Sequence, residues 1–154
     1  MTSYTQPRNV ALKDGEYVKG PGKIIYFDQS DDRALLGTSA KFALGVSAGE
    51  GSRGEDNAYE ATGATVAFYP LGGVLMIQAL NGETWKTGEL AYAGANGLVT
   101  KTAGSDKKIG IYVGPTMSSA TPALVDANEA GDTGATQGMM IAIATNSAEI
   151  GENA

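Results

Sequence analysis

The chain has 154 residues, a net charge of −6, and neither cysteine nor histidine. Its length suits a single domain, and its negative charge disfavours binding to nucleic acid or to an anionic membrane, because both depend on Lys and Arg. The absence of Cys and His removes disulfides, thiolate sites and the usual acid–base group at neutral pH. No apolar run approaches the roughly 20 residues of a membrane span. The first residues lack the basic start of a signal peptide, so we expect a protein made in a cytoplasm.

The chain divides into three parts by composition. Residues 1–15 are polar and contain Pro7 and Gly15, so we expect an extended N-terminal arm. Residues 16–115 alternate short runs of β-forming residues with Gly-rich turns, which predicts a β-barrel domain. Residues 116–154 are expected to form a polar linker, a final strand and a tail that pack on the same domain. The predicted strands are Lys23–Phe27, Lys41–Ser47, Ala64–Tyr69, Val74–Ala79, Glu89–Ala93, Leu98–Lys101, Ile109–Val113 and Met139–Thr145.

An internal repeat is visible in the middle of the chain. The block Gly22–Tyr26 matches Gly88–Tyr92 at an offset of 66 residues, and Leu44-Gly45-Val46 matches Ile109-Gly110-Ile111 at an offset of 65. Both copies predict a strand, a polar turn, a weak strand, and then a strand with an aliphatic-Gly-aliphatic centre. The repeat therefore predicts a barrel or sandwich built from two related hairpin units.

No segment shows a sustained apolar period of 3.6 residues, so we reject an α/β fold. The expected fold is all-β: a small, Gly-rich β-barrel or sandwich of about nine short strands with an internal repeat.

Three local patterns resemble chemical sites but lack the context that those sites require. Gly49–Gly54 matches Gly-x-Gly-x-x-Gly, yet the next residues are acidic and offer no full helix, which favours a surface loop over a nucleotide site. Asp28–Asp32 gathers three carboxylates without the EF-hand spacing, which favours a solvated turn and leaves a loop cation site as the alternative. Glu83, Glu89 and Asp106 could form a catalytic pair only if the fold brings them together. We therefore expect no enzyme, no cofactor and no metal site.

The single tryptophan, Trp85, has two interpretations. With Tyr92 it could form a platform that stacks on a sugar. A lone Trp in a Gly-rich β protein more often fills one end of a barrel core, because burial of its large ring contributes much of the core's stability.

One run of residues carries a resemblance to a known family. It begins at Gly82–Tyr92 (GETWKTGELAY), continues through Ala95–Thr100 (ANGLVT) and ends in Lys108–Gly114 (KIGIYVG). This run resembles the Gly-rich hairpins of small β-barrel capsid decoration (cement) proteins of tailed bacteriophages. The resemblance covers residues 70–115 well and residues 16–50 more loosely. The chain departs from the simplest members in the loop Gly49–Gly63 and in the segment Thr116–Gly138.

The resemblance implies a structural virion protein on the capsid surface, synthesised in the cytoplasm of a bacterial host. It implies no catalysis and no cofactor, and its partner would be the major capsid protein. Such proteins commonly form trimers or other oligomers at lattice junctions, where they bridge neighbouring capsid subunits.

Within this expectation the N-terminal arm is the candidate capsid-binding segment, which would add a strand to an exposed sheet edge of the capsid. A disordered terminus is the alternative. The residues proposed for this contact are Tyr4, Gln6, Pro7, Arg8, Val10 and Leu12. Other functions left open are a carbohydrate- or receptor-binding β module, another virion β protein such as a tail-tube subunit, and an enzyme acting through carboxylates alone.

Overall fold

The computed structural model describes residues 7–13, 16, 18, 20–36, 42–49, 65–80, 82–103, 108–116 and 139–145. Among these residues there are ten strands, one short 3₁₀ helix and no α-helix, which confirms the all-β prediction. The elements are β1 (Arg8–Ala11), β2 (Ile24–Asp28), β3 (Arg33–Leu36), β4 (Phe42–Ser47), β5 (Thr65–Pro70), β6 (Gly73–Ala79), β7 (Leu90–Ala93), η2 (Ala95–Gly97), β8 (Val99–Thr100), β9 (Lys108–Tyr112) and β10 (Met139–Thr145).

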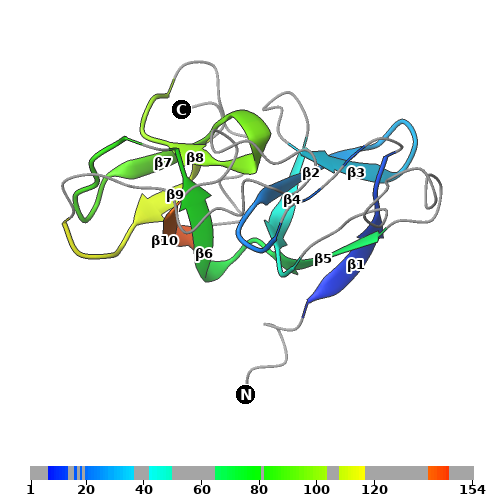
Figure 1. Ribbon diagram of the computed structural model, residues 1–154, viewed down its shortest axis with the longest axis horizontal. Coiled ribbons are helices and arrows are strands. Elements are labelled where there is room, and N and C mark those ends of the chain that lie inside the picture. The colour runs from blue at the N-terminus through cyan, green and yellow to red at the C-terminus, as the bar shows by residue number, and fades with distance from the viewer. Residues whose placement is uncertain are drawn as a thin grey trace, which may run out of the picture.

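The strands form two units that lie side by side (Figure 1). Strands β1–β5, here called the first unit, form a sheet in the order β1-β5-β4-β2-β3. Strands β6–β10, the second unit, form a closed barrel in the order β10-β6-β8-β7-β9. Read around the barrel from β6, the second order is β6-β10-β9-β7-β8, so each strand of the first unit has a counterpart five strands later. The predicted repeat is confirmed, and it covers two whole five-stranded units.

The repeat extends to the register of individual residues. The pairing of β2 with β4 is interrupted between Ile25 and Tyr26, and the pairing of β7 with β9 is interrupted between Ala91 and Tyr92. These positions are 66 residues apart, as are the matching sequence blocks. A β-bulge, where one strand carries an extra residue, has therefore been kept at the same place in both units.

The turns that enter β2 and β7 are also equivalent. Gly22 and Gly88 both have positive φ values, 90° and 95°, a conformation that favours glycine. The amide of Gly22 donates to the carbonyl of Ser47 at 2.9 Å, and the amide of Gly88 donates to the carbonyl of Tyr112 at 2.8 Å. The repeated glycines thus serve backbone geometry, as the sequence pattern predicted.

The first and third strands meet in the same way in both units. In the second unit β6 and β8 pair in parallel through Ala79 and Val99, which closes the barrel, and the Leu80 amide donates to the Val99 carbonyl at 2.8 Å. In the first unit Leu12 and Ala34 form the equivalent parallel bridge, and the Lys13 amide donates to the Ala34 carbonyl at 2.8 Å. Beside this bridge, Glu16 Oε1 accepts from the Leu36 amide at 2.7 Å.

Each unit has its own interior, because alternate residues of a strand point to opposite faces. In the first unit the interior cluster is Leu12, Val18, Ile25, Ala34, Val66 and Phe68. The barrel interior holds the counterparts of most of these residues, including Ala79, Ala91, Val99, Ile141 and Ile143. One buried cluster joins the barrel interior to Ile24, Tyr26, Ala43 and Val46 of the first unit, so the two units share a core.

The sequence analysis did not predict two of the strands, β1 and β3. Arg8–Ala11, expected in an extended arm, is indeed extended but pairs with β5 over four residues and belongs to the folded sheet. Arg33–Leu36, which is absent from the predicted strands, pairs with β2. Both strands have only four residues and lie at the two ends of the first sheet, and so short a run gives little periodic signal in the sequence.

The first prediction concerns the glycines in the two aliphatic-Gly-aliphatic strands. A Cβ atom at Gly45 would lie 2.2 Å from the Tyr69 carbonyl oxygen, and one at Gly110 would lie 2.2 Å from that of Ala144. Because backbone cannot give way, each Gly→Ala change should lower the free energy of unfolding by about 3 kcal/mol in urea titrations. Gly49→Ala is the control: its Cβ would meet nothing within 4 Å, and it should change stability by less than about 0.5 kcal/mol. Equal effects at all three sites would contradict this packing argument.

A second prediction concerns stability at alkaline pH. Tyr112 is fully buried, and burial raises the pKa of its hydroxyl above the ordinary value of about 10. The pKa of Lys13 is also raised, first by its hydrogen bond with Asp28. Above pH of about 10 the folded state therefore holds more protons than the unfolded state, and stability falls as pH rises. Tyr112→Phe should show a shallower fall in unfolding free energy above that pH than the wild type; parallel curves would contradict the assignment.

Candidate binding surface

A row of apolar side chains crosses the outside of the barrel. Leu90 on β7 is paired with Ile111 on β9, Ile111 is paired with Ala144 on β10, and Ala144 is paired with Val74 on β6. Directly paired residues of neighbouring strands project from the same face of a sheet. This face is the outer one, because Leu90, Ile111 and Val74 are 40%, 42% and 60% exposed.

A second row runs beside the first. Met76 on β6 is paired with Ala142 on β10, and the amide of Val113 donates to the Ala142 carbonyl at 3.0 Å. Met76 and Val113 are also exposed. We call the five large exposed side chains of the two rows, Val74, Met76, Leu90, Ile111 and Val113, the apolar stripe. A contiguous exposed apolar surface of this kind typically marks a site of interaction with another macromolecule.

The equivalent face of the first unit is covered. Ile24 and Val46 occupy the positions of Leu90 and Ile111 in the repeat, and they are 0% and 2% exposed. Both belong to the buried cluster that they share with the barrel. The same face of the same topology is therefore a packing surface in one unit and an open surface in the other.

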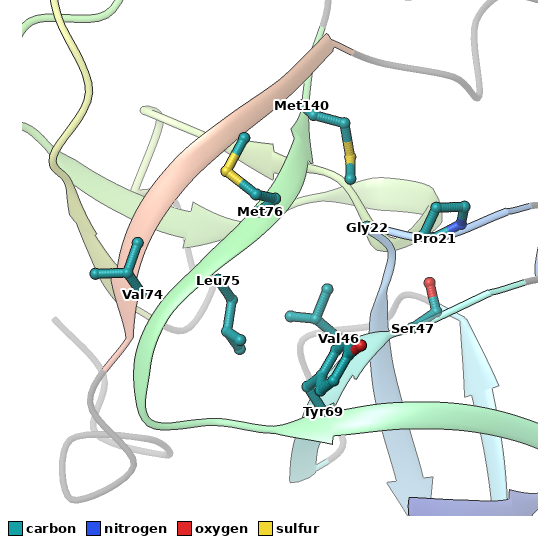
Figure 2. A pocket seen from close by; sticks show the side chains of 9 residues that line it. All are labelled: Pro21, Gly22, Val46, Ser47, Tyr69, Val74, Leu75, Met76 and Met140. Atoms are coloured by element: carbon teal, nitrogen blue, oxygen red, sulfur yellow. The ribbon is translucent and has the colours of Figure 1, made fainter. Parts of the chain in front are cut away.

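A groove runs along the junction of the two units, next to the apolar stripe. Its volume is about 390 Å³. Figure 2 shows Val46 and Tyr69 on the side of the first unit, with Leu75 and Met76 on the side of the barrel. The residues that line this seam groove are Pro21, Gly22, Val46, Ser47, Tyr69, Val74, Leu75, Met76 and Met140. Val74 and Met76 belong to both the stripe and the groove, so the two form one continuous surface.

The polar side chains at this junction are engaged within the chain. The Ser47 hydroxyl donates to the Gly20 carbonyl at 3.0 Å and accepts from the Lys23 amide at 2.9 Å. The Gln78 side chain donates to the Pro21 carbonyl at 2.8 Å. The groove therefore offers mainly apolar contacts, which suit an apolar surface better than a polar substrate.

The residues predicted for the capsid-binding arm have different environments. Tyr4 and Gln6 lie outside the described residues. Pro7 and Arg8 are exposed, and Val10 is half-buried in β1. Leu12 is 1% exposed and lies in the core of the first unit. From Arg8 to Leu12, the predicted arm is therefore part of the folded domain, and Leu12 is held by the chain's own core.

The proposed sugar platform does not exist on the surface of the protein. Trp85 is fully buried and Tyr92 is 7% exposed, so neither ring can stack on a sugar. Trp85 instead packs in the barrel core against Tyr112, with ring centroids 5.6 Å apart and planes inclined by 55°. The interpretation of Trp85 as a core residue is confirmed.

Lys13 pairs with two of the three carboxylates in the acidic loop after β2. The Lys13 ammonium lies 2.8 Å from Asp28 Oδ2 and 3.3 Å from Asp31 Oδ2. Asp28 Oδ1 also accepts a hydrogen bond from the Ser30 hydroxyl at 2.7 Å. Across the part of the chain that the structure describes, no three metal-binding side chains come together. The turn is exposed at Asp31 and Asp32, whereas Asp28 is 6% exposed.

The carboxylates considered for catalysis hold turns in place. Glu83 accepts from the Thr100 hydroxyl at 2.6 Å, and Glu89 accepts from the Lys86 amide at 2.7 Å. The hydrogen bond from the Lys86 amide is the main cause of the lowered pKa of Glu89. A general acid at neutral pH requires the opposite, a raised pKa. Asp106 and residues 50–54 of the Gly-rich loop lie outside the described residues.

Comparisons of the chain with protein-family models, curated proteins and solved structures find no match. Within the described ranges, no helix has the length and hydrophobicity needed to cross a membrane.

The sequence analysis missed the apolar stripe, although a signal for it was present. Strands β6 and β10 are apolar at nearly every position, which is the pattern of strands covered on both faces. In a barrel only one face of each strand points inward, so the other apolar face requires a partner outside the barrel.

The burial of Trp85 gives a third prediction. Its Nε1 finds no hydrogen-bond partner among the described residues, so the ring contributes through packing alone. Trp85→Ala should lower the free energy of unfolding by about 3–5 kcal/mol, because it leaves a large cavity. Trp85→Phe should cost clearly less, since it keeps an aromatic ring and removes an unpaired buried donor. Because Trp85 is buried, adding glycans should not change its fluorescence spectrum. A spectral shift on addition of a sugar would contradict burial and support the sugar-platform interpretation.

Proposed function

We propose that this chain is a structural virion protein that binds the outside of a tailed-phage capsid and stabilises it by bridging major capsid subunits. The observation that carries the proposal is the exposed apolar stripe, a surface built to contact other protein. The resemblance of Gly82–Gly114 to capsid decoration proteins names the kind of assembly. The engaged carboxylates of Glu83 and Glu89 agree with a role that involves no catalysis.

Physically, such a protein acts by mass action. Each molecule that binds only the assembled shell lowers the free energy of that state relative to the dissociated subunits. Where one molecule contacts two capsid subunits, the second contact forms at a high effective concentration, so modest individual contacts give strong retention.

The alternatives receive less support. The carbohydrate-binding alternative depended on Trp85, which is buried. One way for a tail-tube subunit to stack would be to repeat the contact between the two units from molecule to molecule, and the first unit would then have to present the surface that the barrel presents to it. At the positions of Leu75, Met76 and Gly97, the first unit has Arg8, Asn9 and Asp32, all exposed. Charged and polar residues there disfavour continued stacking, much as polar terminal repeats cap a solenoid.

The fourth prediction tests the function directly. The purified full-length chain should add stoichiometrically to expanded empty phage heads in co-sedimentation, and it should raise the temperature at which those heads dissociate. The control is unexpanded heads of the same phage, which lack the final lattice geometry. Absence of the chain from the head fraction at saturating concentration would defeat the proposal.

Two truncations locate the arm's contribution. Deletion of residues 2–6 should preserve the circular dichroism spectrum and the Tm but abolish addition to heads. Deletion of residues 2–12 should unfold the first unit, because it removes β1 and the buried Leu12. Unchanged addition to heads by the shorter deletion would show that the arm is not the capsid contact.

A further inference from the structure

We propose that the open edge of strand β6 takes up an extended segment of the capsid subunit, which adds to the barrel as a further strand within the seam groove. The segment is apolar where it lies over the groove and carries a carboxylate where it reaches Arg8. The capsid as the source of this segment rests on the proposed function. The open edge itself belongs to the isolated chain and can be tested there.

Strand β6 is paired along its whole length on one side only. On that side it pairs with β10 at every residue from Gly73 to Ala79. On the other side, the Gln78 amide donates to the Gly22 carbonyl at 2.8 Å, and Ala79 pairs with Val99. Both contacts lie at the C-terminal end of the strand. Among the described residues, the N-terminal half of β6 therefore has one edge without a backbone partner.

The free backbone groups at this edge belong to Val74 and Met76. In an antiparallel pair, successive residues direct their N–H and C=O groups alternately toward and away from the partner strand. The Gln78 amide points away from β10, toward Gly22. Met76 and Val74 lie two and four residues earlier, so their amides and carbonyls also point away from β10. Both residues line the seam groove, which therefore offers hydrogen-bonding backbone as well as apolar side chains.

The equivalent edge of the first unit is blocked. Strand β1 is the counterpart of β6. Counted back from the equivalent bridges of the two units, Pro7 and Asn9 stand at the positions of Val74 and Met76. Proline has no N–H to donate, and proline at a sheet edge is one way in which β proteins prevent the addition of a foreign strand. Strand β6 contains no proline, so the repeat permits strand addition at the barrel edge alone.

The side chains around the edge define the sequence that fits it. The seam groove has a volume of about 390 Å³, with Val46 and Tyr69 on the wall opposite β6 (Figure 2). Alternate side chains of an added strand would lie on the outer face, beside the exposed side chains of Val74 and Met76. Because these surroundings are apolar, the matching residues of the segment are apolar. In strand addition of this kind, main-chain hydrogen bonds give affinity and side-chain contacts give specificity.

A positive charge lies where the added strand would leave the groove. A hollow of about 720 Å³ adjoins the seam groove and shares Tyr69, Val74 and Leu75 with it. Arg8 is the one charged residue in the described lining of this hollow. It is exposed, and no described carboxylate forms an ion pair with it. A segment that carries an acidic residue beyond Val74 would therefore be complementary to this end of the groove.

The first experiment removes an edge amide without removing a hydrogen bond to β10. Met76→Pro deletes the outward N–H, whereas the matched control Met76→Ala keeps it and loses the same side chain. In co-sedimentation with expanded empty heads, Met76→Pro should bind about tenfold more weakly than Met76→Ala, because a hydrogen bond is lost and the proline ring takes its place. Circular dichroism and the Tm check that both variants keep the fold. Equal binding of the two folded variants would overturn the proposal.

The second experiment measures amide hydrogen exchange in the wild type and needs no variant. In the isolated chain, the amides of Val74 and Met76 should exchange about a hundredfold faster than those of Leu75 and Ile77, which point toward β10. On heads, the first two amides should become protected. Their protection in the isolated chain would show that the chain itself or a second copy covers the edge, and would overturn the proposal.

The third experiment tests the charge at the end of the groove. Arg8→Glu should weaken addition to heads about tenfold at low ionic strength, and Arg8→Lys should keep most of the affinity. The difference should shrink at high salt, because exposed charges are screened. Equal binding of both variants at low salt would rule out the acidic segment.

Failure of the proposed function and failure of the open edge give different results. A wild type that does not add to heads would defeat the proposed function, and with it the capsid as the source of the strand. Heads that take up the wild type, Met76→Ala and Met76→Pro equally well would leave the proposed function standing and defeat the strand addition alone.

Discussion

The packing of one β-unit on the other is the interaction on which the rest of this structure depends. Five short strands can enclose only a thin core, and a sheet of this size is marginal when its outer face is in water. In each unit the first and third strands meet at a single residue pair, Leu12 with Ala34 in the first unit and Ala79 with Val99 in the barrel. The outer face of the first unit, with Ile24 and Val46, gains burial from the barrel. The two units are therefore one cooperative body, although each repeats the topology of the other.

The repeat was readable from the sequence because its signals are local. A glycine between two aliphatic residues is required wherever a neighbouring carbonyl lies too close for a Cβ, and Gly45 and Gly110 meet that requirement in the same way. The bulges at Ile25 and Ala91 follow from the same pairing. Strands β1 and β3 were less visible, because a four-residue strand at the end of a sheet is defined by its distant partner. The pairing of Arg8 with Phe68 spans most of the first unit.

Burial of the outer faces could not be read from the sequence in the same way. Ile24 and Leu90 are both apolar and occupy equivalent positions, yet one is fully buried and the other 40% exposed. The difference lies in what packs against each unit, which is a property of the tertiary arrangement and not of the local pattern. Likewise, Trp85 had two interpretations, and the deciding fact was the burial of its ring.

The asymmetry between the two units also bears on how assembly could be limited. Had both units presented the same two surfaces, the contact between them could repeat from molecule to molecule, and a heterologous contact that does not close produces fibres. The first unit instead carries Arg8 and Asp32 where the barrel has Leu75 and Gly97. A duplicated fold can thus keep an apolar contact face on one unit and place charge on the complementary surface of the other. Such an arrangement stabilises a defined contact while disfavouring continued growth.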